Sequence, residues 1–355
     1  MKKHNFYAGP AILPAAVLEK AKAELTDLNG IGLSVMEISH RSKDFDAIIT
    51  SAEDNFKKLL NIPDNYHILF LQGGASQQFG VIPMNLLQGG TADYINTGAW
   101  AKKAIKEGKL FGNVNIAASS EDKDFSYIPK EFNFAADSKY VHLTSNETIG
   151  GVQFNSFPDT GNVPLIADMS SDIMSRKLDM SKFGLIYAGA QKNIGPSGVT
   201  LVIIRDDLVQ NSADGLTTML SYKTHAEKKS LYNTPPSFGI YLIKLVTDWL
   251  IDLGGIDAIE KINEKKAGLI YGKIDSGDFY NGTANIEDRS KMNVTFRLKS
   301  EDLEKKFIAE ATAAGLIGLK GHRSVGGCRA SIYNALPLES VQALVKFMDE
   351  FEKNN

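Results

Sequence analysis

The chain contains a single cysteine, Cys328, among its 355 residues. A disulfide within the chain and a zinc site of the Cys-x-x-Cys kind are therefore excluded, and we expect no metal. Long apolar runs are also missing, since stretches such as Leu201–Ile204 are far too short to span a bilayer. The basic pair Lys2-Lys3 is not followed by the apolar segment of a secretory signal. We therefore expect a cytoplasmic protein without a membrane partner.

An excess of positive charge is absent as well. The chain has 39 Lys and Arg against 42 Asp and Glu, which gives a formal net charge of −3. Without a broad basic surface, attraction to nucleic acid or to an anionic membrane is not expected. An anionic ligand must instead be bound by a few local cations and backbone N–H groups.

The first two-thirds of the chain alternates short apolar runs with helical patterns, which indicates an α/β fold. The apolar runs are continuous, as is typical of strands covered on both faces, so we expect a mostly parallel seven-stranded sheet between helices. Strands are predicted at His67–Leu71, Ala92–Asn96, Asn113–Ala117, Tyr140–Leu143, Val163–Ala167, Leu185–Tyr187 and Thr200–Ile204. Helices are predicted at Pro14–Leu28, Lys43–Leu60, Ser76–Leu87 and Ala99–Phe111.

A change of pattern after residue 255 predicts a second, smaller domain. A long helix at Ser237–Leu253, with Ser237 as a plausible N-cap, stops at Gly254-Gly255. The remainder predicts a small α+β unit with strands and helices at Asn293–Leu298, Glu301–Ala314, Ala330–Tyr333 and Leu338–Phe351. We expect a large domain over residues 15–255. The small domain is expected to consist of residues 256–355 together with the N-terminal segment 1–14.

Lys192 is the first candidate for chemistry. It lies in the turn Ala188-Gly-Ala-Gln-Lys-Asn-Ile-Gly195 between two apolar strands. Burial would lower the pKa of its amine and make it a nucleophile that can bond an aldehyde cofactor. Alternatively, the side chain extends into water, as most lysines at strand ends do.

Asp168 strengthens the first interpretation, because it directly follows the apolar run Leu165–Ala167. A carboxylate there can pair with a pyridinium nitrogen and keep it protonated. It could instead be only a helix cap.

Three further strand ends carry polar or aromatic residues. The Gly-Gly turn before Ala75 and Ser76 could bind an anion at a helix start, although a simple strand–helix turn explains it equally well. Trp100 could stack on a planar ring or pack in the core. Thr148 could donate to an oxygen substituent or only cap a turn.

Cations and two polar residues complete the candidates. Arginine matches a carboxylate or phosphate with two parallel donors, so separate cationic clusters suit a substrate with two acidic ends. Each arginine taken alone could equally form a surface ion pair. The candidate side chains are His40, Arg41, His322, Arg323 and Arg329, with Asn233 and Thr234 in a rigid Pro-Pro segment as possible phosphate ligands.

Taken together, these segments closely resemble the phosphoserine aminotransferase family, class V members of the fold type I pyridoxal-phosphate enzymes. The resemblance runs nearly end to end. It is carried by Asn5–Pro10, Glu37–Ser42, Leu71–Phe79, Gly98–Trp100, Asn146–Ile149, Ala167–Ser171, Ala190–Pro196, Tyr232–Pro236, Gly321–Arg323 and Arg329–Pro337.

The resemblance implies pyridoxal 5'-phosphate as the cofactor and assigns roles to the candidates. Lys192 would bond the cofactor and shuttle the proton, Trp100 would stack on its ring, Asp168 would hold its nitrogen, and Thr148 would contact its ring oxygen. Gln191, Ala75 and Ser76 would bind its phosphate, with Asn233 and Thr234 reaching it from the partner in a homodimer. Arg329 would bind the substrate α-carboxylate. His40, Arg41, His322 and Arg323 would bind the distal acid or phosphate, some of them across the interface.

The implied reaction is transamination between glutamate and 3-phosphohydroxypyruvate, giving O-phosphoserine and 2-oxoglutarate, with a related step in pyridoxine synthesis as a further option. One departure concerns Ser76, where many relatives carry an arginine, since a hydroxyl does not replace a fixed positive charge at the phosphate. A cysteine desulfurase or another class V aminotransferase is the nearest alternative. A regulator that binds the cofactor without turnover is the non-enzyme alternative.

Overall fold

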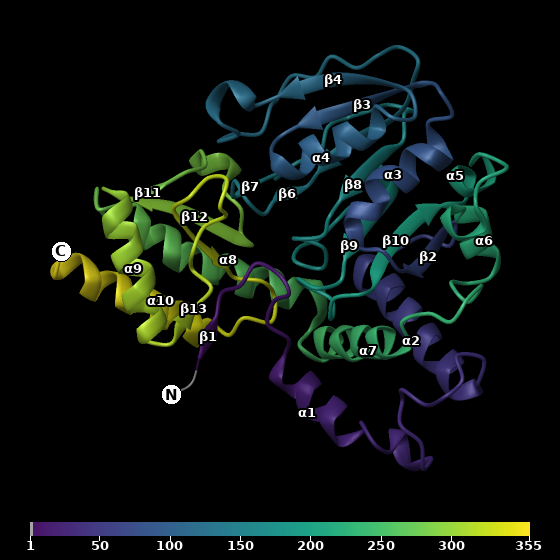
Figure 1. The fold of residues 1–355 in the computed structure, drawn as a ribbon, viewed down its shortest axis with the longest axis horizontal. Helices are drawn as coiled ribbons and strands as arrows, with labels where there is room; N and C mark the ends of the chain where they lie inside the picture. Colours follow the sequence, from purple (N-terminus) through teal and green to yellow (C-terminus); the bar gives the residue numbers. More distant parts are fainter. Residues whose placement is uncertain (1–2) are drawn as a thin grey trace.

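The computed structural model describes residues 3–355, which form a large and a small lobe (Figure 1). The large lobe is built on a seven-stranded sheet with strand order β2-β10-β9-β8-β5-β3-β4. Its strands are β2 (Tyr66–Leu71), β3 (Thr91–Asn96), β4 (Asn113–Ser119), β5 (Ser138–Thr144), β8 (Leu165–Asp168), β9 (Phe183–Gly189) and β10 (Thr200–Arg205).

The sheet is mostly parallel, as the sequence predicts. Only β10 is antiparallel to its neighbours, β2 and β9, while all other adjacent pairs are parallel. The parallel strands therefore end at one edge, where ligands of open α/β sheets bind.

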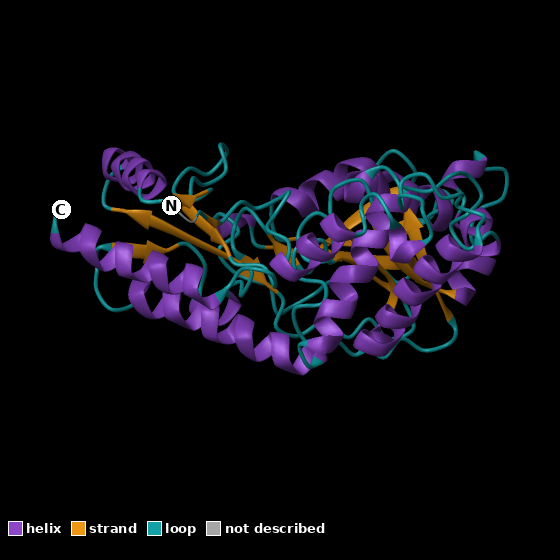
Figure 2. Ribbon diagram, turned by 90° about the horizontal axis from the view of Figure 1, so that it is seen from below, coloured by secondary structure: helices purple, strands orange, loops and turns teal. Residues whose placement is uncertain are grey.

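Helices cover both faces of the large sheet (Figure 2). Successive residues of a strand point to opposite faces, so Ile186 joins the core under one helical layer and Tyr187 the core under the other. One layer contains α1 (Ala15–Ala23), α2 (Lys43–Leu60) and α7 (Ser237–Asp252). The other contains α3 (Gly74–Leu86), α4 (Ala99–Gly108), α5 (Asp206–Gln210) and α6 (Tyr222–Glu227).

The small lobe has its own apolar core around a three-stranded antiparallel sheet, in the order β11-β12-β14. Both described ends of the chain lie in this lobe (Figure 1), and the parallel pair β1–β13 ties the N-terminal segment to it. Its elements are β1 (His4–Asn5), α8 (Gly255–Ile274), β11 (Tyr280–Gly282), β12 (Asn293–Leu298), α9 (Glu301–Ala313), β13 (Leu316–Ile317), β14 (Cys328–Ser331) and α10 (Leu338–Lys353). A short hairpin of β6 (Asn146–Glu147) and β7 (Val152–Gln153) follows β5.

One helix was not predicted, and two local expectations about helices were wrong. The helix α8 was not predicted, because the buried polar residues Asn263 and Lys266 interrupt its apolar stripe. The first helix ends at Ala23 rather than Leu28. Ser237 is the first residue of α7 and not its N-cap, and its hydroxyl donates to the carbonyl of Pro235.

Helix α8 joins the two lobes. Its first half contributes Ile256 and Ile259 to the core of the large lobe, and its second half contributes Ala267 and Ile270 to the core of the small lobe. A domain boundary at residues 255–256 stays a prediction. Among residues 3–355, no helix is both long and apolar enough to cross a membrane.

Lys266 fixes α8 to the chain segment that follows β14. Its side chain is fully buried, and Nζ donates to the carbonyl oxygens of Ile332 at 2.9 Å, Tyr333 at 2.7 Å and Leu336 at 3.2 Å. Burial lowers the pKa of this amine to about 7. The contacts hold the segment after Arg329 of β14 against α8.

We predict that Lys266→Met lowers the free energy of unfolding by about 2–4 kcal/mol, because buried carbonyl oxygens lose the hydrogen bonds that the Lys266 amine donates to them. Chemical denaturation measures the effect. Lys265→Met is the matched control, since Lys265 is the exposed neighbour on the same helix. Equal stability of the two variants would contradict the role given to the Lys266 amine.

Candidate functional site

A cavity of about 310 Å³ lies where the carboxyl ends of the parallel strands meet the small lobe. Nine of the candidates from the sequence line it together, namely Ala75, Ser76, Trp100, Thr148, Asp168, Gln191, Lys192, His322 and Arg329. The N-terminal segment adds Ala8 and Gly9. The size is in the range of small-molecule sites.

Lys192 is buried in this cavity, with only 8% of the residue exposed. Its Nζ donates to Oγ1 of Thr148 at 2.6 Å and lies 5.6 Å from the ring centroid of Trp100. Burial lowers the pKa of the amine to about 8, helped by the positive charge of Arg329 and opposed by the negative charge of Asp168. The amine is thus partly neutral near physiological pH, which makes it a nucleophile and a base.

Asp168 ends β8 and is also buried in the cavity. Its Oδ1 accepts from the backbone N–H of Ser170 at 2.9 Å and from the Ser170 hydroxyl at 2.6 Å. Burial raises the pKa of the carboxyl, while the bonds from Ser170 oppose this change. Among residues 3–355, none donates a hydrogen bond to Oδ2, so one oxygen is available to a ligand.

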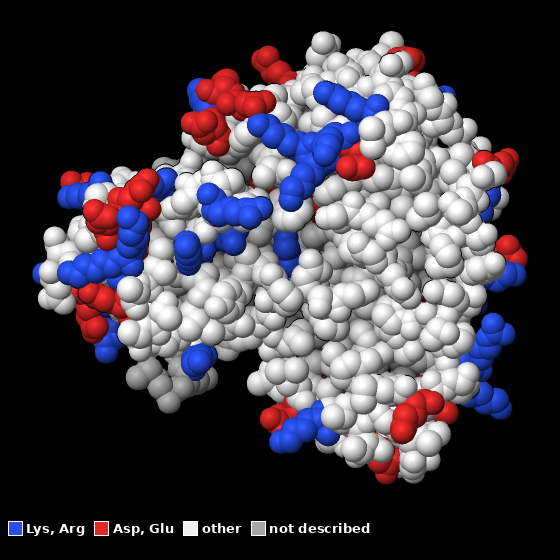
Figure 3. Space-filling model, viewed as in Figure 1, with Lys and Arg blue, Asp and Glu red and all other residues white. Residues whose placement is uncertain are grey.

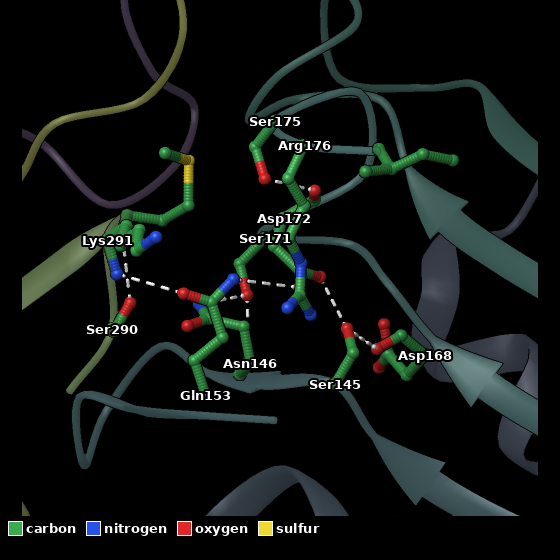
Figure 4. Close-up of polar contacts among 12 residues, drawn as sticks. Ser145, Asn146, Gln153, Asp168, Ser171, Asp172, Ser175, Arg176, Ser290 and Lys291 are labelled. Carbon is green, nitrogen blue, oxygen red and sulfur yellow. Dashed lines mark hydrogen bonds and ion pairs between the residues drawn. The ribbon is translucent and has the colours of Figure 1, made fainter. Parts of the chain in front are cut away.

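A second carboxylate, Asp172, is connected to Asp168 through the side chain of Ser145 (Figure 4). The Ser145 hydroxyl contacts both the carbonyl oxygen of Asp168, at 3.0 Å, and Oδ1 of Asp172. Oδ2 of Asp172 accepts from Gln153 at 3.1 Å and pairs with Arg176 at 3.3 Å. The sequence reasoning missed these residues, although the polar run after Asp168 was a possible signal.

The same buried network reaches the small lobe (Figure 4). Oε1 of Gln153 accepts from the backbone N–H of Lys291 at 2.9 Å, and the amide of Asn146 donates to Asn293 at 2.9 Å. The strand β12, which begins at Asn293, pairs with β14 and positions Arg329. The loops beside Asp168 and the strand of Arg329 are thus connected by hydrogen bonds.

Trp100 is held by Glu147, another residue that the sequence reasoning did not single out. The Glu147 side chain is fully buried and accepts from the backbone N–H groups of Trp100 at 3.2 Å and Ala101 at 2.9 Å. Burial raises the pKa of this carboxyl to about 7, and the bonds from Ala101 and Trp100 act in the opposite direction. The contact fixes the first turn of α4 and hence the place of the indole ring.

The start of α3 forms a glycine-rich turn that lines the cavity. Gly73 and Gly74 have φ angles of 96° and 73°, in the left-handed region that favours glycine. The N–H groups of the first turn of this 13-residue helix have no helical acceptors, and Gly73 provides no side-chain cap. Ala75 and Ser76 lie in this turn and line the cavity, so it can bind a phosphate.

Arg329 extends from β14 into the cavity. One of its terminal nitrogens donates to the carbonyl of Thr148 at 3.2 Å, and its buried Nε has no partner among the described residues. His322 lies near it, and the pKa of its imidazole is lowered by burial and then by the positive charges of Arg329, Arg323 and Lys103. This side of the cavity therefore favours an anion.

Five candidates do not line the cavity within one chain. Arg323 is exposed beside His322, and His40 and Arg41 lie in the loop before α2. Asn233 lines a separate cavity of about 360 Å³ beyond the Gly73 turn. Thr234 lies close by, since its carbonyl accepts from Gln72 at 3.3 Å.

We predict that Gly98→Ala lowers the free energy of unfolding by about 1–3 kcal/mol, because a Cβ atom there would lie 2.5 Å from the Glu147 carboxyl carbon. It should also change Trp100 fluorescence, since Glu147 holds the turn that carries the indole. Thermal unfolding and fluorescence test this. Gly80→Ala is the control, because beyond its chain neighbours and the backbone of its own helix no described atom lies within 4 Å of its Cβ position. Equal behaviour of the two variants would contradict the prediction.

Known proteins resemble this chain in sequence and in fold. The model of the Aminotransferase class-V family matches residues 3–344. A phosphoserine aminotransferase of Desulfosudis oleivorans is 59% identical over 355 residues, covering 99% of this chain and 98% of the relative. The solved phosphoserine aminotransferase of Bacillus circulans subsp. alkalophilus is 54% identical with a TM-score of 0.98, covering 99% of both chains. The PLP-bound phosphoserine aminotransferase of Trichomonas vaginalis is 38% identical with a TM-score of 0.94, covering 98% of this chain and 100% of that one. The chain therefore belongs to the class-V aminotransferase family.

Proposed function

We propose that the chain catalyses the reaction of phosphoserine aminotransferases, the reversible transfer of an amino group from glutamate to 3-phosphohydroxypyruvate. The observation that carries the proposal is the buried, partly neutral amine of Lys192 in one cavity with Asp168 and Arg329. Full-length identity of 59% to a phosphoserine aminotransferase supports it. The use of a phosphorylated hydroxythreonine in pyridoxine synthesis stays a further option, and the cytoplasm stays our predicted compartment.

The residues of the cavity fit pyridoxal 5'-phosphate as the cofactor. Buried polar atoms without a described partner, Nε1 of Trp100 and Oγ1 of Thr144, border the space, and one oxygen of Asp168 is free to accept. Lys192 would bond the aldehyde, Trp100 would cover the ring, Thr148 would contact its oxygen, and Asp168 would hold its nitrogen. The N-terminal turn of α3 and Gln191 would bind the phosphate. When bound, the cofactor withdraws electrons from the substrate α-carbon.

Lys192 moves the proton in this proposal. Because its pKa is lowered to about 8, Nζ can take a proton from the substrate α-carbon and return one at physiological pH. Thr148 orients the amine through its 2.6 Å hydrogen bond. The negative charge of the Asp168 carboxylate would favour a protonated nitrogen in the cofactor ring. Burial of these groups excludes water from them.

Both substrates have a carboxylate and a second acidic end, so one set of cations can serve both. Arg329 would bind the α-carboxylate with parallel N–H donors. His322 and Arg323 would bind the distal end. We propose a homodimer in which His40 and Arg41 complete this distal site from the partner, since neither lines the cavity of its own chain.

Asn233 and Thr234 would likewise reach the cofactor phosphate of the partner subunit. Asn233 lines a different cavity beside the Gly73 turn, and the carbonyl of Thr234 accepts a hydrogen bond from Gln72 nearby. Such contacts would compensate for Ser76, which provides a hydroxyl where many relatives have a positive charge.

A cysteine desulfurase is disfavoured by the position of Cys328. A desulfurase needs an accessible thiolate, whereas Cys328 is buried in β14 and its burial raises the pKa of the thiol. A regulator that binds the cofactor without turnover would show no spectral change with glutamate.

The central prediction is that borohydride reduction of the yellow holoenzyme attaches the cofactor to Lys192, as measured by peptide mapping. Glutamate added first should bleach the absorbance of the bound aldehyde and prevent the labelling. Lys192→Ala should lose both the label and at least about 10⁴-fold in kcat, because no other group supplies the amine. A label on another lysine would contradict the proposal.

The protein without cofactor should capture pyridoxal phosphate with a rate that rises with pH and levels off above about 8, because only the neutral amine reacts. Stopped-flow absorbance measures the rate. Asp168→Asn should move the midpoint to lower pH, since the Asp168 charge raises the pKa of Lys192. A rate that still climbs about tenfold per pH unit between pH 9 and 10 would indicate an ordinary lysine.

A further inference from the structure

Lys103 on α4 is a cation held beside the cavity by an aromatic ring. Its Nζ lies 4.0 Å from the ring centroid of Trp100, which itself lines the cavity. This is a short cation–π contact, which keeps the ammonium group against the indole while its residue is exposed to solvent. Among residues 3–355, no carboxylate forms an ion pair with Lys103, so its charge is free for a ligand.

The preceding residue, Lys102, behaves differently. Its Nζ pairs with Glu121 at 2.6 Å and lies over the ring of Phe125. Both lysines are exposed and belong to the same turn of α4. One positive charge is therefore neutralised by a partner, and the other is not.

Lys103 lies close enough to the cations of the small lobe for their charges to act on the same group. Its charge acts together with those of Arg329 and Arg323 on the imidazole of His322, whose pKa it helps to lower. Figure 3 shows Lys and Arg side chains on both sides of the hollow between the lobes. Cations that act on one imidazole repel each other unless an anion binds among them.

We propose that Lys103 is a specificity-determining residue that binds the distal anionic group of the substrate from the large lobe. The inference rests on the proposed function. A phosphate carries up to two negative charges at neutral pH and a carboxylate carries one, so Lys103 would favour the phosphorylated substrate over glutamate. Trp100 would then both cover the cofactor and hold the selective cation in place.

The test compares holoenzymes of the wild type, Lys103→Met, Lys103→Arg and Lys102→Met. Methionine keeps an unbranched chain against Trp100 but removes the charge. We expect Lys103→Met to raise KM for O-phosphoserine by about 5- to 20-fold, to raise KM for glutamate by less than about 3-fold, and to leave kcat within about 2-fold. Lys103→Arg should restore most of the loss, and Lys102→Met should behave as the wild type.

A binding measurement provides a readout besides turnover. Inorganic phosphate should bind Lys103→Met more weakly by a similar factor in calorimetry, with the difference disappearing at high salt. Equal weakening of glutamate and O-phosphoserine would overturn the proposal, since it would indicate only altered support of Trp100. Equal effects of Lys102→Met and Lys103→Met, or no effect of either, would overturn it too. If the wild type gave no spectral change with either amino donor, the proposed function and this inference would both fall.

Discussion

The buried amine of Lys192 is the feature on which the rest of the site depends. A charged ammonium in an apolar environment is costly, so burial shifts the amine toward its neutral form, with a pKa of about 8. The negative charge of Asp168 raises the pKa of the amine and so limits the shift, whereas the positive charge of Arg329 lowers it further. In the proposed function these three groups would serve as the base, the carboxylate that holds the cofactor nitrogen and the cation for the substrate carboxylate. All three side chains line one cavity, so the charge of each acts on the other two.

The fold explains how distant parts of the sequence reach this cavity. Parallel strands end at a common edge, so the turns after β3, β5, β8 and β9 converge there. The small lobe adds Arg329 through β14, and a buried hydrogen-bond network through Asn146, Gln153 and Asp172 joins that lobe to the loops beside Asp168. Helix α8 also connects the lobes, because it contributes residues to both apolar cores and its buried Lys266 donates to the carbonyl of Tyr333.

Much of this organisation could be predicted from the sequence, because it follows from local patterns. Short, mostly apolar segments predicted all seven strands of the sheet, and α2 was predicted with its observed ends. Lys192 and Asp168 were identified because each follows such a run. Glu147, Asp172 and Lys266 were missed, since buried polar residues are recognised by partners distant in sequence, such as Ala101, Ser145 and Tyr333. The roles proposed for His40, Arg41, Asn233 and Thr234 depend on a dimer interface that we propose and that no local pattern describes.

A crystal structure of the protein grown with pyridoxal phosphate would test the central claim most directly. The account predicts continuous electron density between the coenzyme and Nζ of Lys192, with the ring nitrogen facing Asp168 and the indole of Trp100 against the ring. A coenzyme bound elsewhere, with the Lys192 amine pointing into solvent, would contradict it.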